Sequence, residues 1–397
     1  MNQQGMKAEN KQKIYRAISE VPGISRVNIA KQCKFSKTTV SILVDELIQE
    51  GYVVDGGLSL NQVTGQGRKP SSLFLNKKAH CLIVVNWHKR YIQICSADLG
   101  CSVKKVRTVV PDGVEDVQLF LAGQIREFIR TECGESHVLA VCMILPAMID
   151  RAGGEVISAV LSEKQTYRVM ERLSRELQEY SLVFFNDTAC MAYAEKVYGS
   201  GNRRDDFVYI NLNDGIGAAF VLGGGLLGGA GGMTTQFGHF SLGREGESCI
   251  CGGHGCLETR VGEQALAQRI RECGAEASFE GCDPVLFRDV GARGAAGDAG
   301  ALRVMDALAQ DIGYALGNLI TMLRVDRVVL GGLGRNLGEG FLQRVRQAVT
   351  GIGFQQFVQR SVIEYTTLDE DALFGGAARY YMDNYFAFSE QSERMVM

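Results

Sequence analysis

The sequence predicts an α/β protein with a small helical head and a larger two-lobed body. Three observations carry this prediction. Helical segments separated by short breaks fill the first 50 residues, and strand-like and helical runs alternate from residue 77 on. A 21-residue stretch, 238–258, also gathers a histidine and three cysteines among glycines. At 397 residues, the chain is long enough for about two or three domains with sizeable cores.

The head begins with three helices. Residues 10–17 open the first, Ser25 caps a second over 26–33, and Ser36 caps a third over 37–50. The third helix carries an apolar stripe at helical spacing: Val40, Leu43, Val44 and Leu47. Two short helices, a tight turn and a third helix describe a helix-turn-helix.

A wing completes the head. Residues 52–54 and 58–60 are predicted as two short strands, and a glycine-rich basic arm follows, so the head is a winged helix-turn-helix. The expected DNA-binding residues lie on the tip of the third helix or on this arm: Ser36, Lys37, Thr38, Thr39, Ser41, Arg68 and Lys69. Such a tip reaches base edges in a major groove, and a basic arm enters a minor groove or grips phosphates. A small helical domain used for protein contact is the alternative.

The charge distribution separates the head from the body. The first 80 residues hold 12 Lys and Arg against 6 Asp and Glu, and the remainder holds 30 against 39. A basic head on an acidic body suggests that one end meets a polyanion. Basic patches are also often only solvated, so charge alone does not decide the partner.

The body alternates strands and helices, which is typical of α/β units. Strands are predicted at 80–85, 91–97, 102–110, 138–145, 182–185, 207–212, 217–222 and 327–330. Helices are predicted at 114–132, 188–197, 262–273 and 301–323. We place the head at 1–76 and the body at 77–388, with lobes at about 77–190 (plus a C-terminal helix) and 191–370; 389–397 is expected to be disordered.

Composition limits the compartment. Apolar residues make up 46% and charged residues 22%, as in ordinary soluble proteins. The chain has no apolar run of about 18 residues or more, and its N-terminus has no apolar signal core. Twelve cysteines without a secretion signal indicate a reducing compartment. We therefore expect a cytoplasmic protein.

The stretch 238–258 predicts a metal site. Its spacing is H-x9-C-x-C-x4-C, formed by His239, Cys249, Cys251 and Cys256. Three thiolates and one imidazole are the ligands of a closed tetrahedral structural zinc site, and the glycines allow a tight wrap around a small ion. His254 is expected to be a solvated loop residue. The alternative is that these are ordinary loop cysteines.

The same stretch, GHFSLGREGESCICGGHGCLE, resembles the motif of the ROK family, which holds sugar kinases and sugar-responsive repressors. The resemblance extends from about residue 10 to about residue 385. The head string SRVNIAKQCKFSKTTVSILVDELIQEGYV and the arm GQGRKP are similar to the xylose-repressor branch. The resemblance implies that the body has the two-lobed, actin-like ATPase fold of sugar kinases.

The resemblance also implies that phosphoryl transfer is lost, so we predict no enzyme. Where family kinases have Asp-x-Gly-x-Thr for the phosphates, this chain has Asn86, His88 and Arg90. In the second phosphate loop Asp214 replaces a threonine or serine, and a carboxylate repels phosphate. The family's catalytic base position holds Asp187, which would be vestigial; an N-cap role for Asp187 is the alternative.

The family's sugar-binding positions are Asn186, Asp187, Gln236, His239 and Glu258 in this chain. Carboxylates and amides at fixed positions bind several hydroxyls at once. Gln236 departs from the family's glutamate, which keeps the geometry and loses the charge.

These expectations combine into a sugar-responsive DNA-binding repressor of carbohydrate metabolism genes. It would carry structural zinc and work as a homodimer or homotetramer on operator DNA. One alternative is a ROK-type sugar kinase with a fused regulatory head. The other is a constitutive DNA-binding protein whose body is a dimerisation scaffold.

Overall fold

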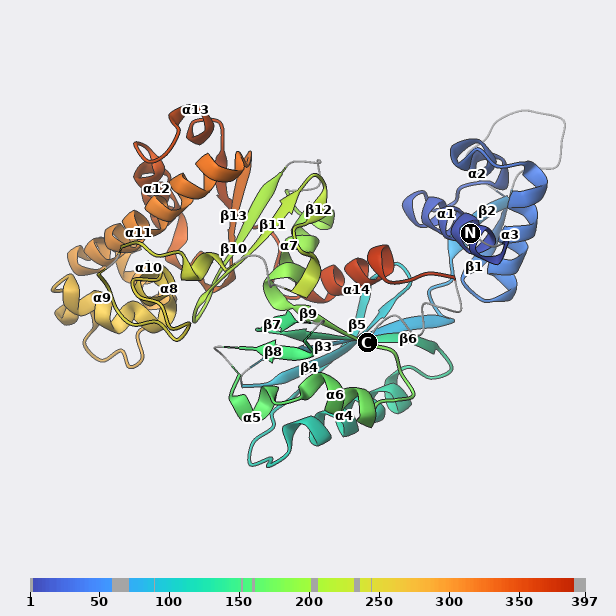
Figure 1. The fold of residues 1–397 in the computed structure, drawn as a ribbon, viewed down its shortest axis with the longest axis horizontal. Coiled ribbons are helices and arrows are strands. Elements are labelled where there is room, and N and C mark those ends of the chain that lie inside the picture. Colours follow the sequence, from blue (N-terminus) through green and yellow to red (C-terminus); the bar gives the residue numbers. More distant parts are fainter. Residues whose placement is uncertain are drawn as a thin grey trace.

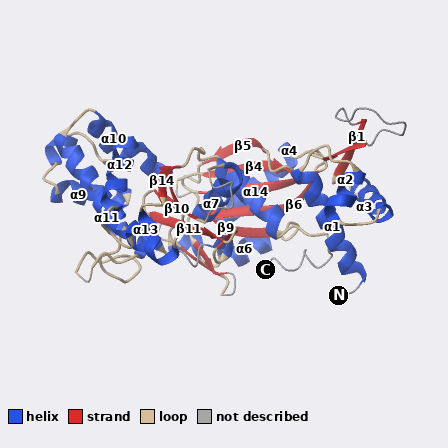
Figure 2. Cartoon of the chain, turned by 90° about the horizontal axis from the view of Figure 1, so that it is seen from above, coloured by secondary structure: helices blue, strands red, loops and turns tan. Residues whose placement is uncertain are grey.

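The computed structural model describes residues 3–58, 71–88, 90–150, 153–158, 161–200, 206–231, 236–243 and 245–388. A helical head, a first lobe and a second lobe follow one another along the long axis (Figures 1 and 2). Arg68, Lys69 and the tail 389–397 lie outside the described residues. Among the described helices, none is both long enough and apolar enough to cross a membrane.

The head is built as predicted around three helices: α1 (Gln3–Glu20), α2 (Arg26–Cys33) and α3 (Lys37–Gln49). Both predicted caps are confirmed. Ser25 Oγ accepts a hydrogen bond from the Asn28 N–H at 3.3 Å, and Ser36 Oγ accepts one from the Thr39 N–H at 3.0 Å. The apolar stripe of α3 packs with α1, α2 and the wing into one small core.

The wing differs from its prediction. β1 (Val53–Leu58) pairs antiparallel with β2 (Ser71–Leu75), so the second strand follows the basic arm. The partner strand of the wing is thus β2 and not the predicted segment 58–60: Leu58 belongs to β1, and residues 59–70 lie outside the described residues. Leu73 of β2 reaches the head core.

The body contains two five-stranded sheets of the same topology. The first has the order β5-β4-β3-β6-β9 and the second β12-β11-β10-β13-β14. In each sheet the hairpin is antiparallel and the next strand runs parallel to the first. The first sheet consists of β3 (His80–Trp87), β4 (Ile92–Asp98), β5 (Val103–Val109), β6 (His137–Leu145) and β9 (Leu182–Asn186). The second consists of β10 (Phe207–Leu212), β11 (Ile216–Leu222), β12 (Gly225–Leu226), β13 (Arg327–Gly331) and β14 (Val362–Tyr365). β7 (Met148–Asp150) and β8 (Glu155–Ile157) form a separate pair.

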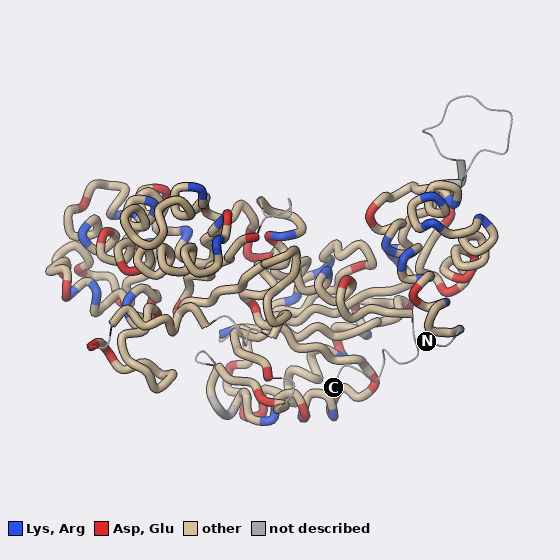
Figure 3. Tube along the Cα trace, turned by 45° about the horizontal axis from the view of Figure 1, so that its top comes forward, with Lys and Arg blue, Asp and Glu red and all other residues tan. Residues whose placement is uncertain are grey.

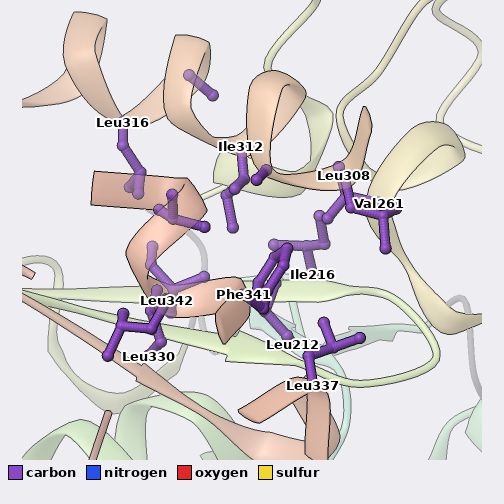
Figure 4. Close-up of a cluster of buried hydrophobic side chains, with 14 of the residues drawn as sticks. Leu212, Ile216, Val261, Leu308, Ile312, Leu316, Leu330, Leu337, Phe341 and Leu342 are labelled. Atoms are coloured by element: carbon purple, nitrogen blue, oxygen red, sulfur yellow. The ribbon is translucent and has the colours of Figure 1, made fainter. Parts of the chain in front are cut away.

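Helices cover the faces of both sheets. In the first lobe α4 (Val117–Glu132) and α6 (Val169–Glu176) cover one face of the sheet. The short helix α5 (Glu163–Thr166) comes just before α6 in the chain. The helices of the second lobe are α8 (Glu258–Val261), α9 (Leu266–Glu272), α10 (Phe287–Ala295), α11 (Ala299–Leu323), α12 (Gly338–Val349) and α13 (Gln355–Val358). Figure 4 shows their core, where Leu212 and Leu330 from the strands meet Ile312 and Phe341 from the helices.

Two helices connect the lobes. α7 (Asp187–Tyr198) and α14 (Ala372–Asn384) pack against each other and share a core with both sheets. They approach at backbone distance, because a Cβ at Gly376 would lie 2.2 Å from the carbonyl oxygen of Cys190. α7 begins directly at the end of β9, so the candidate residues Asn186 and Asp187 stand at this junction between the lobes.

Candidate metal centre and interlobe site

The segment 238–258 is folded by its own backbone bonds. The Cys249 N–H donates to the Gly253 carbonyl at 2.9 Å, and the Gly252 N–H returns to the Cys249 carbonyl at 2.9 Å. Gly252 and Gly255 have φ values of 86° and 65°, which residues with a side chain rarely adopt. The glycines predicted to allow a tight wrap therefore do so at these two positions.

The four predicted ligands converge. The ligand atoms of His239, Cys249, Cys251 and Cys256 lie within 4.8 Å of one another. His239 Nδ1 is 3.5 Å from Cys249 Sγ, and the sulfurs of Cys251 and Cys256 are 3.6 Å apart. Zinc bonds of about 2.0–2.3 Å in a tetrahedron place their ligand atoms roughly 3.5–3.8 Å apart. The donor set and its spacing thus fit a closed metal site.

His254 stays outside this cluster. Its side chain is exposed, and its Nδ1 lies 3.4 Å from Ser248 Oγ. The expectation of a solvated loop histidine agrees with this position.

The metal segment is attached to the β10–β11 hairpin. The Leu257 N–H donates to the Phe240 carbonyl at 2.9 Å, which closes the segment at its base. Glu258 follows, and its Oε2 accepts the Ile216 N–H at 2.9 Å. A fixed metal loop therefore fixes the carboxylate of Glu258 against the hairpin.

Asn186 and Asp187 have different roles at the start of α7. Asn186 is the N-cap, since its Oδ1 accepts the Ala189 N–H at 2.9 Å, and its Nδ2 donates to the Ala147 carbonyl at 2.9 Å. The N-cap considered for Asp187 is thus wrong: the cap is the residue before it. The Asn186 amide is engaged at both ends within the fold, which leaves Asp187 with the freer side chain.

The Asp187 carboxyl is only partly exposed, and burial raises its pKa to about 6 although Thr188 donates to it. The Thr188 N–H reaches Asp187 Oδ1 at 2.7 Å and the hydroxyl reaches it at 3.3 Å. One oxygen is thereby oriented, and a carboxyl with a pKa near 6 is ionised at neutral pH. It is suited to accept hydrogen bonds from ligand hydroxyls.

Three predicted sugar-binding segments meet at residues 215–217. A Cβ at Gly217 would lie 2.3 Å from Thr188 Oγ1, one at Gly215 would lie 2.3 Å from Glu258 Oε2, and one at Gly238 would lie 2.4 Å from the Ile216 carbonyl oxygen. Asp187, Glu258 and His239 are therefore anchored around one strand end. Gln236 lies two residues before Gly238 in the sequence, and its side chain is exposed.

The predicted DNA-binding residues that the structure describes lie together at the start of α3. Ser36, Lys37 and Thr38 are exposed, whereas Thr39 and Ser41 are half-buried. The Thr39 hydroxyl lies 2.8 Å from Ser36 Oγ and so belongs partly to the cap. Lys and Arg mark the helices of the head in Figure 3.

Sequence reasoning missed Ile42 on the same helix. Its side chain is 54% exposed, off the buried stripe and one turn beyond the polar tip. An exposed apolar residue on a recognition helix suits contact with a thymine methyl group. The sequence signal for its exposure was that Ile42 lies between Ser41 and Leu43 and so falls outside the apolar stripe of the helix.

The comparisons with known proteins agree with this architecture. Residues 88–382 match the ROK family. The chain belongs to the ROK family. Residues 7–54 match a winged helix-turn-helix DNA-binding family. The predicted fold, a winged helix-turn-helix followed by a ROK kinase-like body, is confirmed.

Three relatives place the chain within the ROK family. A xylose repressor from Caldicellulosiruptor bescii is 25% identical over 397 residues, covering 97% of this chain and 98% of the repressor. A ROK family transcriptional regulator described as a homologue of the Escherichia coli MLC protein superposes with a TM-score of 0.80 at 22% identity, covering 95% of this chain and 97% of that one. The Thermus thermophilus ROK hexokinase superposes with a TM-score of 0.62 at 25% identity and covers 76% of this chain and 98% of its own.

Side chains in the β3–β4 and β10–β11 hairpins make contacts within the protein. In the β3–β4 hairpin, Asn86 Nδ2 donates to Gln93 Oε1 at 3.3 Å. The rings of His88 and Tyr91 stack with centroids 4.5 Å apart. In the β10–β11 hairpin, Asn213 Oδ1 accepts the Leu333 N–H at 2.9 Å. Asn86 and Asn213 therefore both bond to groups of the protein itself.

Proposed function

We propose that this chain is a sugar-responsive transcriptional repressor whose head binds operator DNA and whose body releases that DNA when a sugar binds. One observation carries the proposal: a winged helix-turn-helix is joined to a ROK body whose phosphate-facing groups are engaged internally. The C. bescii relative, which aligns over head and body alike, is a xylose repressor and supports the same function.

The DNA-binding surface is the tip of α3 with its basic surroundings. Lys37 and Thr38 are exposed at the first turn, and Lys31 and Lys34 are exposed on and after α2. Cations bind phosphates through counterion release, while the hydroxyls and Ile42 are suited to base edges. Arg68 and Lys69 belong to the proposal through their sequence alone. A homodimer or homotetramer would place paired heads on two half-sites.

The sugar site is formed by Asp187 and Glu258, with Gln236 and His239 beside them. Asp187 keeps a carboxylate oxygen that its Thr188 contacts do not use, and Glu258 keeps Oε1 beyond its bond to the Ile216 N–H. Two carboxylates anchored on opposite sides of residues 215–217 suit a ligand with several neighbouring hydroxyls. Asn186 acts by capping α7 and so orients Asp187.

Phosphoryl transfer is not part of this function. A kinase needs free donors and a metal-binding carboxylate around the triphosphate. Here Asn86 stands at the carboxylate position, and the Ile216 and Leu333 N–H groups already donate to Glu258 and Asn213. Asp187 is left as a hydrogen-bond acceptor for sugar hydroxyls.

Zinc is proposed as the structural metal of the 238–258 segment. When bound, it holds His239 and the three cysteines in a fixed tetrahedron and takes no part in chemistry. The chain's own contacts then place the sugar site, since Glu258 comes two residues after Cys256 and bonds to the hairpin. Such support of neighbouring residues is typical of structural metal sites.

A continuous path of contacts joins the sugar site to the head. Tyr193 on α7 donates to Asp383 Oδ2 on α14 at 2.7 Å, and Arg16 on α1 donates to the Asp383 carbonyl at 2.9 Å. Movement at the start of α7 therefore has a direct route through α14 to the first helix of the head.

The chain beyond α14 strengthens this route. Phe386 and Phe388 pack against Tyr52 of the head with ring centroids 5.6 and 5.0 Å apart, and Lys11 lies 5.3 Å from the Phe388 ring centre. His80, the first residue of β3, stacks on Tyr52 at 4.1 Å. We infer that a sugar which shifts α7 reorients the head through this aromatic contact, a two-state change biased by the ligand.

The test uses the full chain, supplied with zinc, and an operator selected from a random duplex library. We expect a sugar from a panel of pentoses, hexoses and N-acetylhexosamines to weaken DNA binding by roughly tenfold in a gel shift. Lys37→Ala should weaken DNA binding by about tenfold. Arg130→Ala, which removes an exposed cation of α4 in the body, should leave it unchanged.

The same protein separates the alternatives. Asp187→Ala should abolish the sugar response and leave DNA binding intact. ATP turnover with any sugar in a coupled assay, lost in Asp187→Ala, would establish the kinase instead. DNA binding that no sugar alters, with no sugar raising the Tm, would leave the body as a scaffold.

A further inference from the structure

Two cysteines of the first lobe lie together at the edge of a shallow hollow. Cys81 opens β3 after His80, and Cys133 ends α4. Both line a hollow of about 90 Å³ and both pack in the same apolar cluster. The two thiols are close enough to influence each other's titration. Cys81 is 7% exposed, while Cys133 is half-buried and so more open to solvent.

Charge around the hollow favours a thiolate on Cys133. Three lysines line it (Lys77, Lys104 and Lys105), against the two carboxylates Asp98 and Glu132. Each carboxylate already has a cation: Lys104 is 3.2 Å from Asp98, and Lys105 and Arg107 are 3.0 and 3.1 Å from Glu132. The neighbouring Cys81 thiol and then the charge of Lys105 lower the pKa of the Cys133 thiol. The neighbouring Cys133 thiol and burial raise the pKa of Cys81.

Other cysteines lack this environment. Cys33 and Cys273 are also half-buried, but burial raises the pKa of both. The buried thiols of Cys95, Cys142 and Cys190 have raised pKa values for the same reason. Outside the metal segment, and among the described residues, Cys133 is thus the cysteine with a lowered pKa.

We propose that Cys81 and Cys133 form a redox modification site. Oxidation by a peroxide would produce a reversible disulfide between these two cysteines. The Cys133 thiolate attacks one oxygen of hydrogen peroxide, the O–O bond breaks, and after proton uptake one water leaves, so that Cys133 is oxidised to the sulfenic acid. The Cys81 sulfur then attacks the Cys133 sulfur, and the sulfenic hydroxyl leaves as a second water with the proton of Cys81. Two thiols and one peroxide thereby give one disulfide and two waters.

The disulfide would form beside the segment that connects the head to the body. Ser136 Oγ donates to the Lys78 carbonyl at 2.6 Å, and the His137 N–H donates to the Ala79 carbonyl at 2.8 Å. His80, next to Cys81, contacts Tyr52 of the head. Cys81 and Cys133 therefore flank residues 78–80. A disulfide between them would link the start of β3 to the end of α4. This proposal does not depend on sugar binding.

The test treats the zinc-supplied full chain with limiting hydrogen peroxide and maps thiols by peptide mass spectrometry under non-reducing conditions. We expect a linked Cys81–Cys133 peptide that is two hydrogens lighter than the separate peptides and is restored by dithiothreitol. It should form before zinc appears in solution. Alkylation of the reduced protein should be at least tenfold faster at Cys133 than at Cys273.

Variants distinguish a reactive pair from a general loss of packing. Cys81→Ala should leave a sulfenic acid on Cys133 that a dimedone probe captures. Cys133→Ser, at the more exposed position, should abolish both products, and the matched Cys273→Ser should leave the linked peptide unchanged. Equal reactivity of Cys133 and Cys273, or oxidation of Cys133 that Cys81 never resolves in the folded wild-type protein, would overturn the proposal.

Discussion

The two sheets of the body carry the same hairpin, and the two hairpins differ in which residues they have kept. The β3–β4 hairpin has Asn86, His88 and Arg90 at the positions that the sequence resemblance assigns to the carboxylate, glycine and threonine of ROK kinases. The β10–β11 hairpin keeps Gly215 and Gly217. The retained glycines have a packing reason, because a Cβ at either would overlap the side chain of Glu258 or Thr188. A glycine in a phosphate loop is therefore not by itself a sign of phosphate binding.

The hairpins also differ in the hydrogen bonds that hold them in place. The His88 N–H donates to the Tyr91 carbonyl at 2.9 Å, so the first hairpin closes on itself. The Ile216 N–H of the second donates to Glu258, which the metal segment positions. The second hairpin is thus tied to Glu258 and through it to the segment 238–258, whereas the first closes on itself.

Loss of the metal should have the largest effect and should separate the hairpins. Cys256→Ser removes a buried ligand, and because structural zinc contributes several kcal/mol we expect the Tm to fall by roughly 10 °C. The Ile216 amide should exchange its hydrogen faster, while the His88 amide keeps its rate. Differential scanning calorimetry and hydrogen exchange provide both measurements.

The control for that variant is Cys282→Ser, since Cys282 is a half-buried cysteine outside the ligand cluster. Its Tm should stay close to that of the wild type. Faster exchange at both hairpins in Cys256→Ser would mean that the metal supports the whole body and that the hairpins do not differ in the way described.

The glycine argument predicts effects of opposite sign for one chemical change. Gly217→Ala places a Cβ 2.3 Å from Thr188 Oγ1, so the free energy of unfolding should fall by about 1–3 kcal/mol and sugar binding should weaken as Asp187 shifts. Gly123→Ala, on the exposed face of α4 with no atom near the new Cβ, should raise the free energy of unfolding by about 0.5–1 kcal/mol. Urea unfolding measures both.

A neutral outcome for Gly217→Ala would remove the packing explanation. The two glycines of the turn would then need another reason, and ATP binding would have to be measured directly by calorimetry with magnesium present. Unchanged stability together with weakened sugar binding would place the effect on Asp187 alone.

Local features were predictable from the sequence, because their causes lie within a few residues. Ser25 and Ser36 each precede an apolar stripe, and each caps its helix as expected. The metal segment also follows from spacing, since all four ligands lie within 18 residues of one another. The extension of α1 back to Gln3 was missed, because residues 3–9 contain one large apolar residue, Met6, and no apolar stripe to mark a helix. The domain boundaries at 76 and 190 stay predictions.

Contacts between distant segments were not predictable. Nothing near Arg16 reveals that it bonds to the Asp383 carbonyl, and nothing near Tyr52 reveals Phe388 as its neighbour. Asn186 and Asp187 show the limit within one dipeptide. Either residue type can cap a helix, and only the backbone position decided that Asn186 does so.

The smallest expected effect is a pH dependence of sugar affinity through Asp187. Burial raises the Asp187 pKa to about 6, and in the proposed site the ionised form would accept hydrogen bonds from sugar hydroxyls. Sugar affinity should therefore be constant above about pH 7 and fall by up to tenfold for each pH unit below about 6. Calorimetric titration with the sugar found in the screen, between pH 5 and 8, measures this.

Asp187→Asn supplies the matched control, because it keeps the shape and an acceptor for the Thr188 N–H while removing the charge. Its sugar affinity should be lower and independent of pH. Stability should move the other way. A carboxyl whose folded pKa lies above its unfolded value of 3.8 stabilises the fold most below pH 4 and loses that contribution as pH rises through about 6. At pH 8 the asparagine variant should therefore be more stable than the wild type, by on the order of 1–2 kcal/mol. If wild-type affinity is flat from pH 5 to 8 while Asp187→Asn still binds as tightly, the sugar contacts lie elsewhere, and the second hairpin has kept its glycines for packing alone.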